Sequence, residues 1–350
     1  MLDNFVDIMG YQLEKVHTGV IAWLLDSDRS PLPLYEQVQL AEKLAPSLFQ
    51  QKINVGKITA HQEFSFGRVL RIDLVLELHL EGEAKSYILI ECKTDSDVRI
   101  EQLKQSEAAF KQRFPNSPYF IIVLATGAGQ FTVTGQLQKI RKLGYQAITL
   151  CEAINLFTGL SMTGKNKIYD DWLAALAAER DRSSRIDSAL ANVKDPWDSS
   201  LAKSGYRLGF PVFYMFYDKI RAQLELGPYK NWDISSGSNN PVMNWHEVWV
   251  PVRAVQDPIV LYWEFNWHSF CLKAAIKKNN EQVWADDVRP ALVQLCSSCP
   301  IKGGRMVRNR KGTYLTAYKW DFDFCKQSPA AIANEITKIL SFLHHKLKTV

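Results

Sequence analysis

The chain contains 350 residues, of which 47% are hydrophobic and 23% are charged, a composition typical of a folded protein that excludes a disordered one. This length is sufficient for two domains, each with its own hydrophobic core. The formal net charge of +5 permits nucleic-acid binding without requiring it. The sequence shows no basic N-terminal segment followed by an apolar stretch and no apolar run long enough to span a membrane, so we expect a cytoplasmic protein.

The first predicted element is a helix over residues 13–25. Glu14 and His17 are three residues apart in it and therefore point in similar directions. His17 has an alternative interpretation as a buried histidine that forms a hydrogen bond with the backbone. The apolar residues follow helical spacing and would cover one face of a sheet: Leu13, Val16, Val20, Ile21, Leu24 and Leu25.

A β-hairpin is the next clear pattern. Every second residue from 74 to 80 is leucine, which places Asp73 on the opposite face of a strand. Gly82 lies in a polar segment and can adopt a positive φ, so the chain can reverse there. A turn centred on Gly82 places Asp73 opposite Glu91, with Cβ atoms about 5 Å apart. Lys93 then shares a face with Glu91, because side chains of a strand repeat every two residues.

Two facing carboxylates beside an ammonium group suit metal-dependent hydrolysis of phosphodiester bonds. Mg²⁺, or Mn²⁺ in its place, prefers oxygen ligands, so Asp73 and Glu91 with a main-chain carbonyl and phosphate oxygens would form a suitable shell. Lys93 would hold or deprotonate the attacking water and neutralise charge that develops on the phosphate. The alternative is a cross-strand salt bridge with no catalytic role.

The elements after the hairpin complete an α/β domain that we assign to residues 1–178. We expect a linker at residues 179–205, because its arginines, serines and Pro196 interrupt the apolar period. The domain's remaining predicted elements are a helix at 100–110, a wholly apolar strand at 119–125, a helix at 136–143, a strand at 145–150 and helical segments over 151–178.

Residues 206–350 predict a second, α+β domain, in which an antiparallel sheet is packed by helices on one side. Its closing helix is well marked, with Ser328 as the cap and Pro329 in the first turn. The other predicted elements are a helix at 211–224, strands at 244–252, 258–266 and 269–277, a helix at 282–295 and a strand at 313–322.

Aromatic residues at alternating positions are concentrated in this second domain. They are Trp245, Trp249, Trp263, Phe265 and Trp267. The default interpretation is that they form the buried face of the sheet. If one row is exposed instead, it could stack on unpaired bases, or bind a protein partner or a second copy of the chain.

A basic segment at residues 302–312 is the clearest local cluster of positive charge. It contains three glycines and the basic residues Lys302, Arg305, Arg308, Arg310 and Lys311. A flexible basic loop of this kind can follow a phosphate backbone, and binding of that kind depends strongly on salt. The alternative is a solvated hairpin loop.

The paired acids and the Glu-x-Lys sequence resemble the PD-(D/E)XK nuclease superfamily, whose core runs αβββαβ and whose catalytic residues lie on the second and third strands. Residues 14–26 are similar to the opening helix of a bacterial branch, several members of which are associated with defence against phage. The resemblance implies a restriction-endonuclease-like αβββαβ core. It also implies that Glu14 approaches the metal directly or through water, that His17 orients it or touches phosphate, and that Gln102 faces the site.

Two departures limit this resemblance. Ile72 stands where the family's proline would be, and neither Gln102 nor Gln105 is followed four residues later by a tyrosine, so the exonuclease-associated Gln-x-x-x-Tyr signature is absent. We therefore expect a Mg²⁺-dependent nuclease, with a DNA endonuclease favoured and antiviral defence suggested by resemblance. The alternatives are an RNA-directed nuclease with the same site and a catalytically silent nuclease fold that acts as a binding or assembly module.

Overall fold

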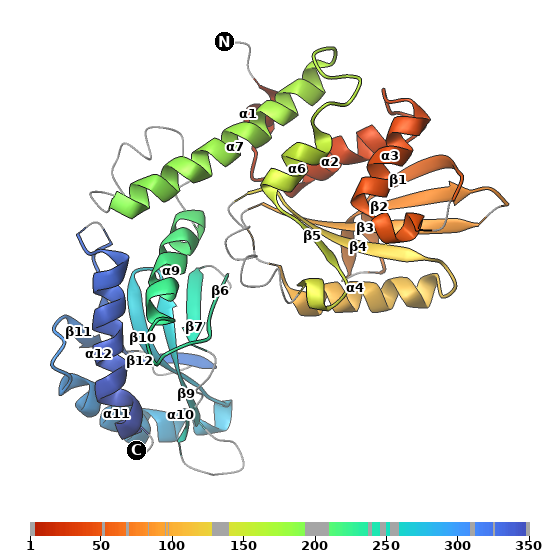
Figure 1. Ribbon diagram of the computed structural model, residues 1–350. Coiled ribbons are helices and arrows are strands. Elements are labelled where there is room, and N and C mark those ends of the chain that lie inside the picture. Colours follow the sequence, from red (N-terminus) through yellow and green to blue (C-terminus); the bar gives the residue numbers. More distant parts are fainter. Residues whose placement is uncertain are drawn as a thin grey trace. The chain divides into compact units, whose positions relative to one another are not determined.

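The computed structural model describes residues 4–50, 53–67, 70–82, 84–94, 96, 98–127, 140–192, 210–236, 240–245, 250–252, 259–308, 312–324 and 326–347. The chain divides into two compact units, Met1–Ser184 and Arg185–Val350 (Figure 1). In these described ranges, no helix has both the length and the apolar character needed to cross a membrane.

A five-stranded mixed sheet forms the centre of the first unit, with the strand order β1-β2-β3-β4-β5. The first three strands are antiparallel neighbours, and β4 and β5 continue the sheet in parallel with β3. Their bounds are Val55–Ser65 (β1), Arg71–Leu80 (β2), Lys85–Lys93 (β3), Tyr119–Ala125 (β4) and Gln146–Ile148 (β5).

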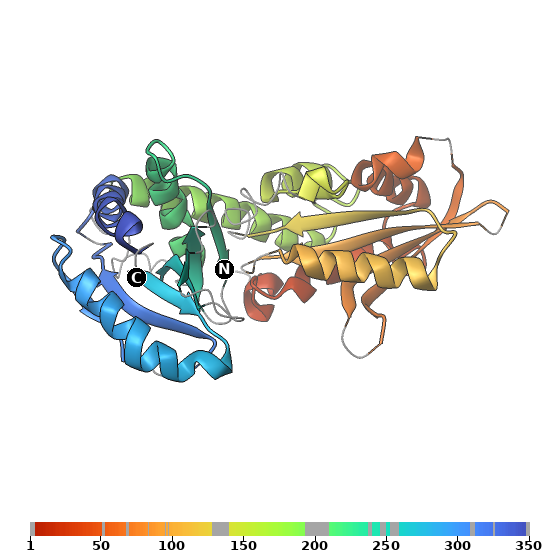
Figure 2. The same ribbon diagram turned by 90° about the horizontal axis from the view of Figure 1, so that it is seen from below.

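Helices cover both faces of this sheet, which explains why β3 is almost entirely buried and β4 is wholly apolar. One face packs against α2 (Glu14–Leu25), α3 (Leu34–Leu44), α6 (Leu150–Phe157) and α7 (Lys167–Asn192). The other face packs against α4 (Ile100–Arg113), which lies below the sheet in Figure 1 and in front of it in Figure 2. A short helix, α1 (Phe5–Met9), precedes α2, and a 3₁₀ turn, Pro46–Phe49, follows α3.

The predicted αβββαβ order is confirmed by α2, β1, β2, β3, α4 and β4, with α3 inserted before β1. The strand predicted at 145–150 is present as β5, whereas most of the helix predicted at 136–143 lies outside the described residues. Residues 179–192, expected to begin a linker, are helical because α7 continues to Asn192. Charged residues can extend a helix without an apolar stripe, and Arg182 pairs there with Glu179 at 2.6 Å.

The second unit contains an antiparallel sheet with the strand order β11-β12-β10-β9-β7-β6, and β8 also pairs with β9. Helix α9 packs on β6 and β7, α11 packs on β11 and β12, and α12 packs on both helices, as predicted for an α+β domain. The strands are Trp232–Ser236 (β6), Pro241–Trp245 (β7), Val250–Val252 (β8), Ile259–Asn266 (β9), Ser269–Ala275 (β10), Gly304–Met306 (β11) and Tyr314–Asp321 (β12). The helices are α9 (Phe210–Leu224), α10 (Glu281–Val283), a π-helical segment (Trp284–Val288), α11 (Arg289–Ser297) and α12 (Pro329–Leu347), and a 3₁₀ turn, Lys278–Asn280, precedes α10.

The aromatic residues of this sheet form its core, as the default interpretation predicted. Trp245, Trp263 and Phe265 are only 4%, 2% and 0% exposed. An exposed row that stacks on bases is therefore wrong for these three side chains, because the register aligns them on the helix-covered face. Trp267 is half-buried against Phe213, and Trp249 lies outside the described residues.

Candidate active site

The hairpin of β2 and β3 has the predicted register. Leu74 pairs with Ile90 and Leu76 with Ile88, so Asp73 lies opposite Glu91 at the next position. Gly82 adopts a φ of +81° in the turn, as its place in the sequence required. The backbone N–H of Cys92 donates a hydrogen bond of 2.8 Å to Oδ2 of Asp73, which holds this carboxylate at the end of β3.

The ammonium group of Lys93 lies among three carboxylates. Its Nζ is 2.8 Å from Oε1 of Glu91, 3.5 Å from Oε2 of Glu14 and 3.9 Å from Oδ2 of Asp73. It also donates a hydrogen bond of 3.0 Å to the main-chain oxygen of Cys92. The Lys93 and Glu91 side chains are only 11% and 7% exposed, so most of this charge is shielded from water.

Glu14 reaches this cluster from the first turn of α2. Its Oε1 accepts hydrogen bonds from the hydroxyl of Ser96 at 2.7 Å and from the backbone N–H of Thr94 at 3.4 Å. The convergence that was predicted for Glu14, Asp73 and Glu91 is therefore observed around Lys93. No sequence pattern pointed to Ser96 or Thr94, because a hydrogen-bond donor in a loop after a strand has no periodicity of its own.

Burial and mutual repulsion shift the ionisation of the cluster. Burial raises the pKa values of Asp73 and Glu91 above their ordinary range, and the neighbouring acids add to the effect while Lys93 opposes it. Burial lowers the pKa of Lys93, but the carboxylates of Glu91, Glu14 and Asp73 outweigh it, so this pKa is raised overall. Lys93 is therefore an ammonium at neutral pH in this arrangement.

The donor set fits a hard divalent cation in charge and chemistry. Three carboxylates face one ammonium, which leaves an excess of negative charge in a partly dry site, and all the donors are oxygens. Across the described ranges, no three acidic, histidine or cysteine side chains form a ready-made metal cage. Asp73, Glu91 and the main-chain oxygen of Cys92 would hold the ion, with Glu14 as a direct or water-bridged ligand.

His17 is buried in the core, in agreement with its alternative interpretation as a histidine that forms a hydrogen bond with the backbone, and its catalytic role stays a prediction. Its ring is 0% exposed, its Nε2 lies 2.8 Å from the carbonyl oxygen of Tyr11, and its Nδ1 accepts a hydrogen bond of 3.2 Å from Nε1 of Trp172. This pattern requires Nε2 to carry the proton and donate it to Tyr11. Both ring nitrogens are thus engaged inside the core, where they hold the segment before α2.

Gln102 lies in the first turn of α4 and is half-buried. Within the described parts of the chain, no hydrogen bond joins it to Asp73, Glu91 or Glu14, so its predicted place in the site stays a prediction. A more deeply buried residue of the same helix, Ser106, lines a cavity of about 10 Å³ next to Glu91.

The basic segment of the second unit is partly ordered. Residues Gly304–Met306 form β11, so the prediction of a flexible loop is wrong at that position. Arg305 pairs with Oδ2 of Asp321 through two nitrogens, at 2.9 and 2.8 Å. Lys302 and Arg308 are exposed. Arg310 and Lys311 lie outside the described residues.

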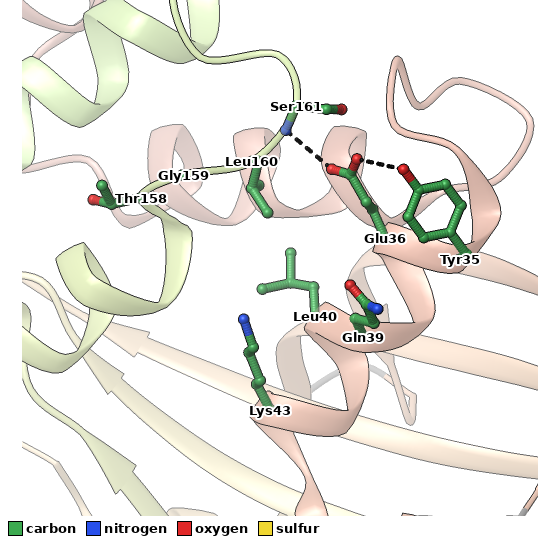
Figure 3. Close-up of a pocket in the computed structure, with 9 residues that line it drawn as sticks. All are labelled: Tyr35, Glu36, Gln39, Leu40, Lys43, Thr158, Gly159, Leu160 and Ser161. Carbon is green, nitrogen blue, oxygen red and sulfur yellow. Dashed lines mark hydrogen bonds between the residues drawn. The ribbon is translucent and has the colours of Figure 1, made fainter.

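A separate pocket of about 280 Å³ lies between α3 and residues 158–161 (Figure 3). Glu36 points toward the loop and accepts hydrogen bonds from the backbone N–H of Ser161 and from the hydroxyl of Tyr35, both at 3.1 Å. None of the predicted site residues lines this pocket. The contacts of Glu36 therefore tie the loop after α6 to α3.

Comparison with known proteins yields one match. Residues 3–168 match the family described as the PD-(D/E)XK nuclease superfamily. The matched range contains Glu14, Asp73, Glu91 and Lys93 and ends before the second unit. No curated protein and no solved structure matches the chain.

Proposed function

Since its first unit belongs to the PD-(D/E)XK nuclease superfamily, we propose that this protein is a divalent-cation-dependent nuclease that cleaves DNA internally. The observation that carries the proposal is the convergence of three carboxylates on the Lys93 ammonium at the end of a β-hairpin. The proposed cation is Mg²⁺, with Mn²⁺ as a substitute.

Each residue of the cluster has a distinct proposed role. Asp73 and Glu91 bind the cation, and the hydrogen bond from the Cys92 N–H keeps Asp73 oriented toward it. When bound, such a cation polarises a phosphate oxygen and lowers the pKa of a bound water. Lys93 donates a hydrogen bond to a phosphate oxygen and places a positive charge beside it. Without a bound cation, the carboxylates of Glu91, Glu14 and Asp73 raise the pKa of Lys93, so Lys93 is an ammonium there.

Glu14 completes the negative side of the site from α2. The Ser96 hydroxyl and the Thr94 N–H donate to one of its oxygens, which leaves the other directed toward Lys93. Glu14 can therefore orient a water or a cation with Oε2 while Oε1 keeps its hydrogen bonds to Ser96 and Thr94. Removal of Glu14 should therefore weaken activity less than removal of Asp73.

Incubation of the full chain with plasmid DNA, single-stranded DNA and total RNA tests the proposal, with Mg²⁺, with Mn²⁺ and with EDTA. We expect metal-dependent cleavage that Asp73→Asn and Lys93→Ala abolish. Asp28→Asn is the matched control, because Asp28 is 65% exposed and pairs only with the exposed Lys57 among the described residues. Cleavage that survives both site variants would remove the proposed site.

The same assay and a calorimetric titration separate the DNA nuclease from the two other candidates. Preferential cleavage of RNA would favour the RNA-directed alternative, because phosphate contacts alone do not distinguish the polymers. Absence of Mg²⁺ and Mn²⁺ binding in calorimetry would favour a silent binding or assembly module. The register that places Asp73 opposite Glu91 and the buried Glu91–Lys93 pair support the enzyme, since a fold alone does not need buried charges at this place.

The second unit is proposed to recognise substrate or a partner, with Lys302, Arg305, Arg308, Arg310 and Lys311 along the nucleic-acid backbone. A binding assay with these residues neutralised together tests this role, and an unchanged affinity would contradict it. The proposed biological role is defence against phage, which rests on the similarity of residues 14–26 to the defence-associated branch. Equal plaque counts on cells with and without the protein would contradict that role.

A further inference from the structure

We infer that Lys15 and Arg71 bind the phosphate backbone of the nucleic-acid substrate beside the acidic cluster, and that Glu63 holds both cations in position until the substrate replaces it. This inference rests on the proposed nuclease function and names the residues that bring the polymer to the site.

Lys15 and Arg71 flank the acids from two different elements. Lys15 directly follows Glu14 in α2, and Arg71 begins β2 two residues before Asp73. Both side chains reach the same carboxylate oxygen, Oε1 of Glu63, at 2.9 Å and 3.5 Å. Residues that are distant in sequence thus place two positive charges together next to the cluster.

The position of Glu63 explains why these cations lie next to the site. In the β1–β2 register Gln62 pairs with Leu74 and Phe64 with Ile72, so Glu63 falls opposite Asp73. Its backbone has a φ of +49°, which is uncommon for a residue other than glycine and interrupts the ladder at this point. Glu63, Asp73 and Glu91 therefore occupy a row of neighbouring backbone positions on three adjacent strands.

The electrostatics of this row create a need for nearby positive charge. Glu63 and Asp73 are carboxylates at neighbouring strand positions, so they repel each other. A polyanionic backbone is repelled by such a row unless cations lie alongside. Lys15 offers a mobile point charge, and Arg71 offers a planar guanidinium that matches two phosphate oxygens.

The exposure of the three side chains makes the exchange feasible. Lys15, Arg71 and Glu63 are 75%, 64% and 42% exposed in their pairs. Exposed ion pairs contribute little to folding stability and are weakened by salt. A phosphate can therefore replace the Glu63 carboxylate without a large loss of stability, whereas the buried Glu91–Lys93 pair could not be exchanged in this way.

The opposing interpretation is that the two pairs only fasten α2 and β2 to β1. The two interpretations predict opposite results for Glu63→Gln. If Glu63 competes with phosphate, neutralising it frees both cations and strengthens nucleic-acid binding. If the pairs are fasteners, the same change loosens the structure and weakens binding or leaves it unaltered.

The test is fluorescence anisotropy of a labelled DNA duplex, a single DNA strand and a single RNA strand with the full chain, over a series of NaCl concentrations. Ca²⁺ replaces Mg²⁺ in this assay, because Ca²⁺ also binds oxygen ligands but accepts a more flexible geometry. A gel verifies that the nucleic acid stays intact. We expect Lys15→Ala and Arg71→Ala each to weaken binding several-fold and to reduce the slope of log affinity against log salt by about 1. Glu63→Gln should strengthen binding several-fold, and Arg71→Lys should keep the salt slope but lose part of the affinity, because lysine makes no bidentate contact with phosphate.

Lys57→Ala is the matched control, because Lys57 lies on the same strand as Glu63 and forms an exposed pair with Asp28. It should leave affinity and salt slope unchanged, and all variants should keep the calorimetric affinity for metal. If the wild type binds but Lys15→Ala and Arg71→Ala behave like Lys57→Ala, only this inference is overturned. Weakened binding by Glu63→Gln also overturns it, whereas a wild type that binds no nucleic acid overturns the proposed function as well.

Discussion

Replacement of Lys93 by methionine should destabilise the protein strongly in the absence of divalent cations. The substitution keeps an unbranched side chain of similar length but removes the ammonium from the three carboxylates within 4 Å of it. Glu91, whose side chain is 7% exposed, would lose its nearest positive charge at 2.8 Å. The variant therefore measures directly how much the cluster depends on a cation.

The magnitude follows from the burial of the pair. Removing one partner of a buried ion pair costs about 3 to 5 kcal/mol. The lower value applies here, because the Asp73 and Glu14 side chains are 30% and 28% exposed and retain some hydration. In a unit of the size of residues 1–184, about 3 kcal/mol corresponds to a fall in Tm of about 6 to 12 °C.

The deficit should depend on pH with a defined sign. In the wild type the pKa of Lys93 is raised, so its stabilising effect is present at all pH values below the ordinary lysine pKa and disappears only above it. In the variant, the already raised pKa values of Asp73 and Glu91 rise further, and the native state gains stability as pH falls through them. The difference in stability is thus largest near neutral pH and shrinks toward about pH 4.

Differential scanning calorimetry with and without Mg²⁺ provides the measurement, with Lys57→Met as the exposed control. A cation at a hundred times its dissociation constant adds about 2.7 kcal/mol. The Lys93→Met variant should gain more from Mg²⁺ than the wild type, in which the ion competes with the ammonium. A variant as stable as the wild type at neutral pH, or a deficit that does not change with pH, would refute the clustered-charge geometry.

Three further outcomes are expected. His17→Ala should lower the free energy of unfolding by about 3 kcal/mol in urea titrations, because two buried partners lose their hydrogen bonds. The folded fraction of this variant should keep its cleavage rate. Loss of cleavage with unchanged stability would instead support a catalytic role for His17. Gly127→Ala should reduce both Tm and calorimetric metal affinity, because the new Cβ would lie 2.5 Å from the carbonyl oxygen of Thr94. Unchanged values of both would contradict this prediction and show that the backbone moves to make room for the Cβ. Metal affinity should rise with pH and binding should release protons, because Asp73 and Glu91 have raised pKa values. Calorimetry in two buffers of different ionisation enthalpy measures the number of protons released, and a value of zero would contradict this prediction.

The part of the site that the sequence predicted correctly is the part fixed by one local turn. The alternating leucines of β2 and the glycine of the turn determine the β2–β3 register, and that register places Asp73 opposite Glu91. Glu14 was found through the family resemblance, because nothing in the local pattern relates a helix start to a distant strand end. His17 has the same spacing relation to Glu14, yet its ring lies in the core with Tyr11 and Trp172 as partners.

The residues that were missed lie where the local pattern is weak. Strand β1 has only one buried residue, Ile58, so its sequence lacks the alternation that reveals a strand, and Glu63 was not recognised. Strands β6 and β11 lie at the two edges of the second sheet, and β11 has no buried residue. The continuation of α7 to Asn192 was missed because charged side chains carry no apolar period.

The turn between β2 and β3 has a consequence for how this chain can change over evolutionary time. Because adjacent strand positions face opposite sides, inserting or deleting one residue after Gly82 would send Glu91 and Lys93 to the side occupied by α2 and leave Asp73 behind. The identity of most residues in this turn is free to drift, whereas their number is not. Length variation among relatives should therefore accumulate elsewhere in the chain, and a relative with a turn one residue longer or shorter should carry compensating changes or no activity.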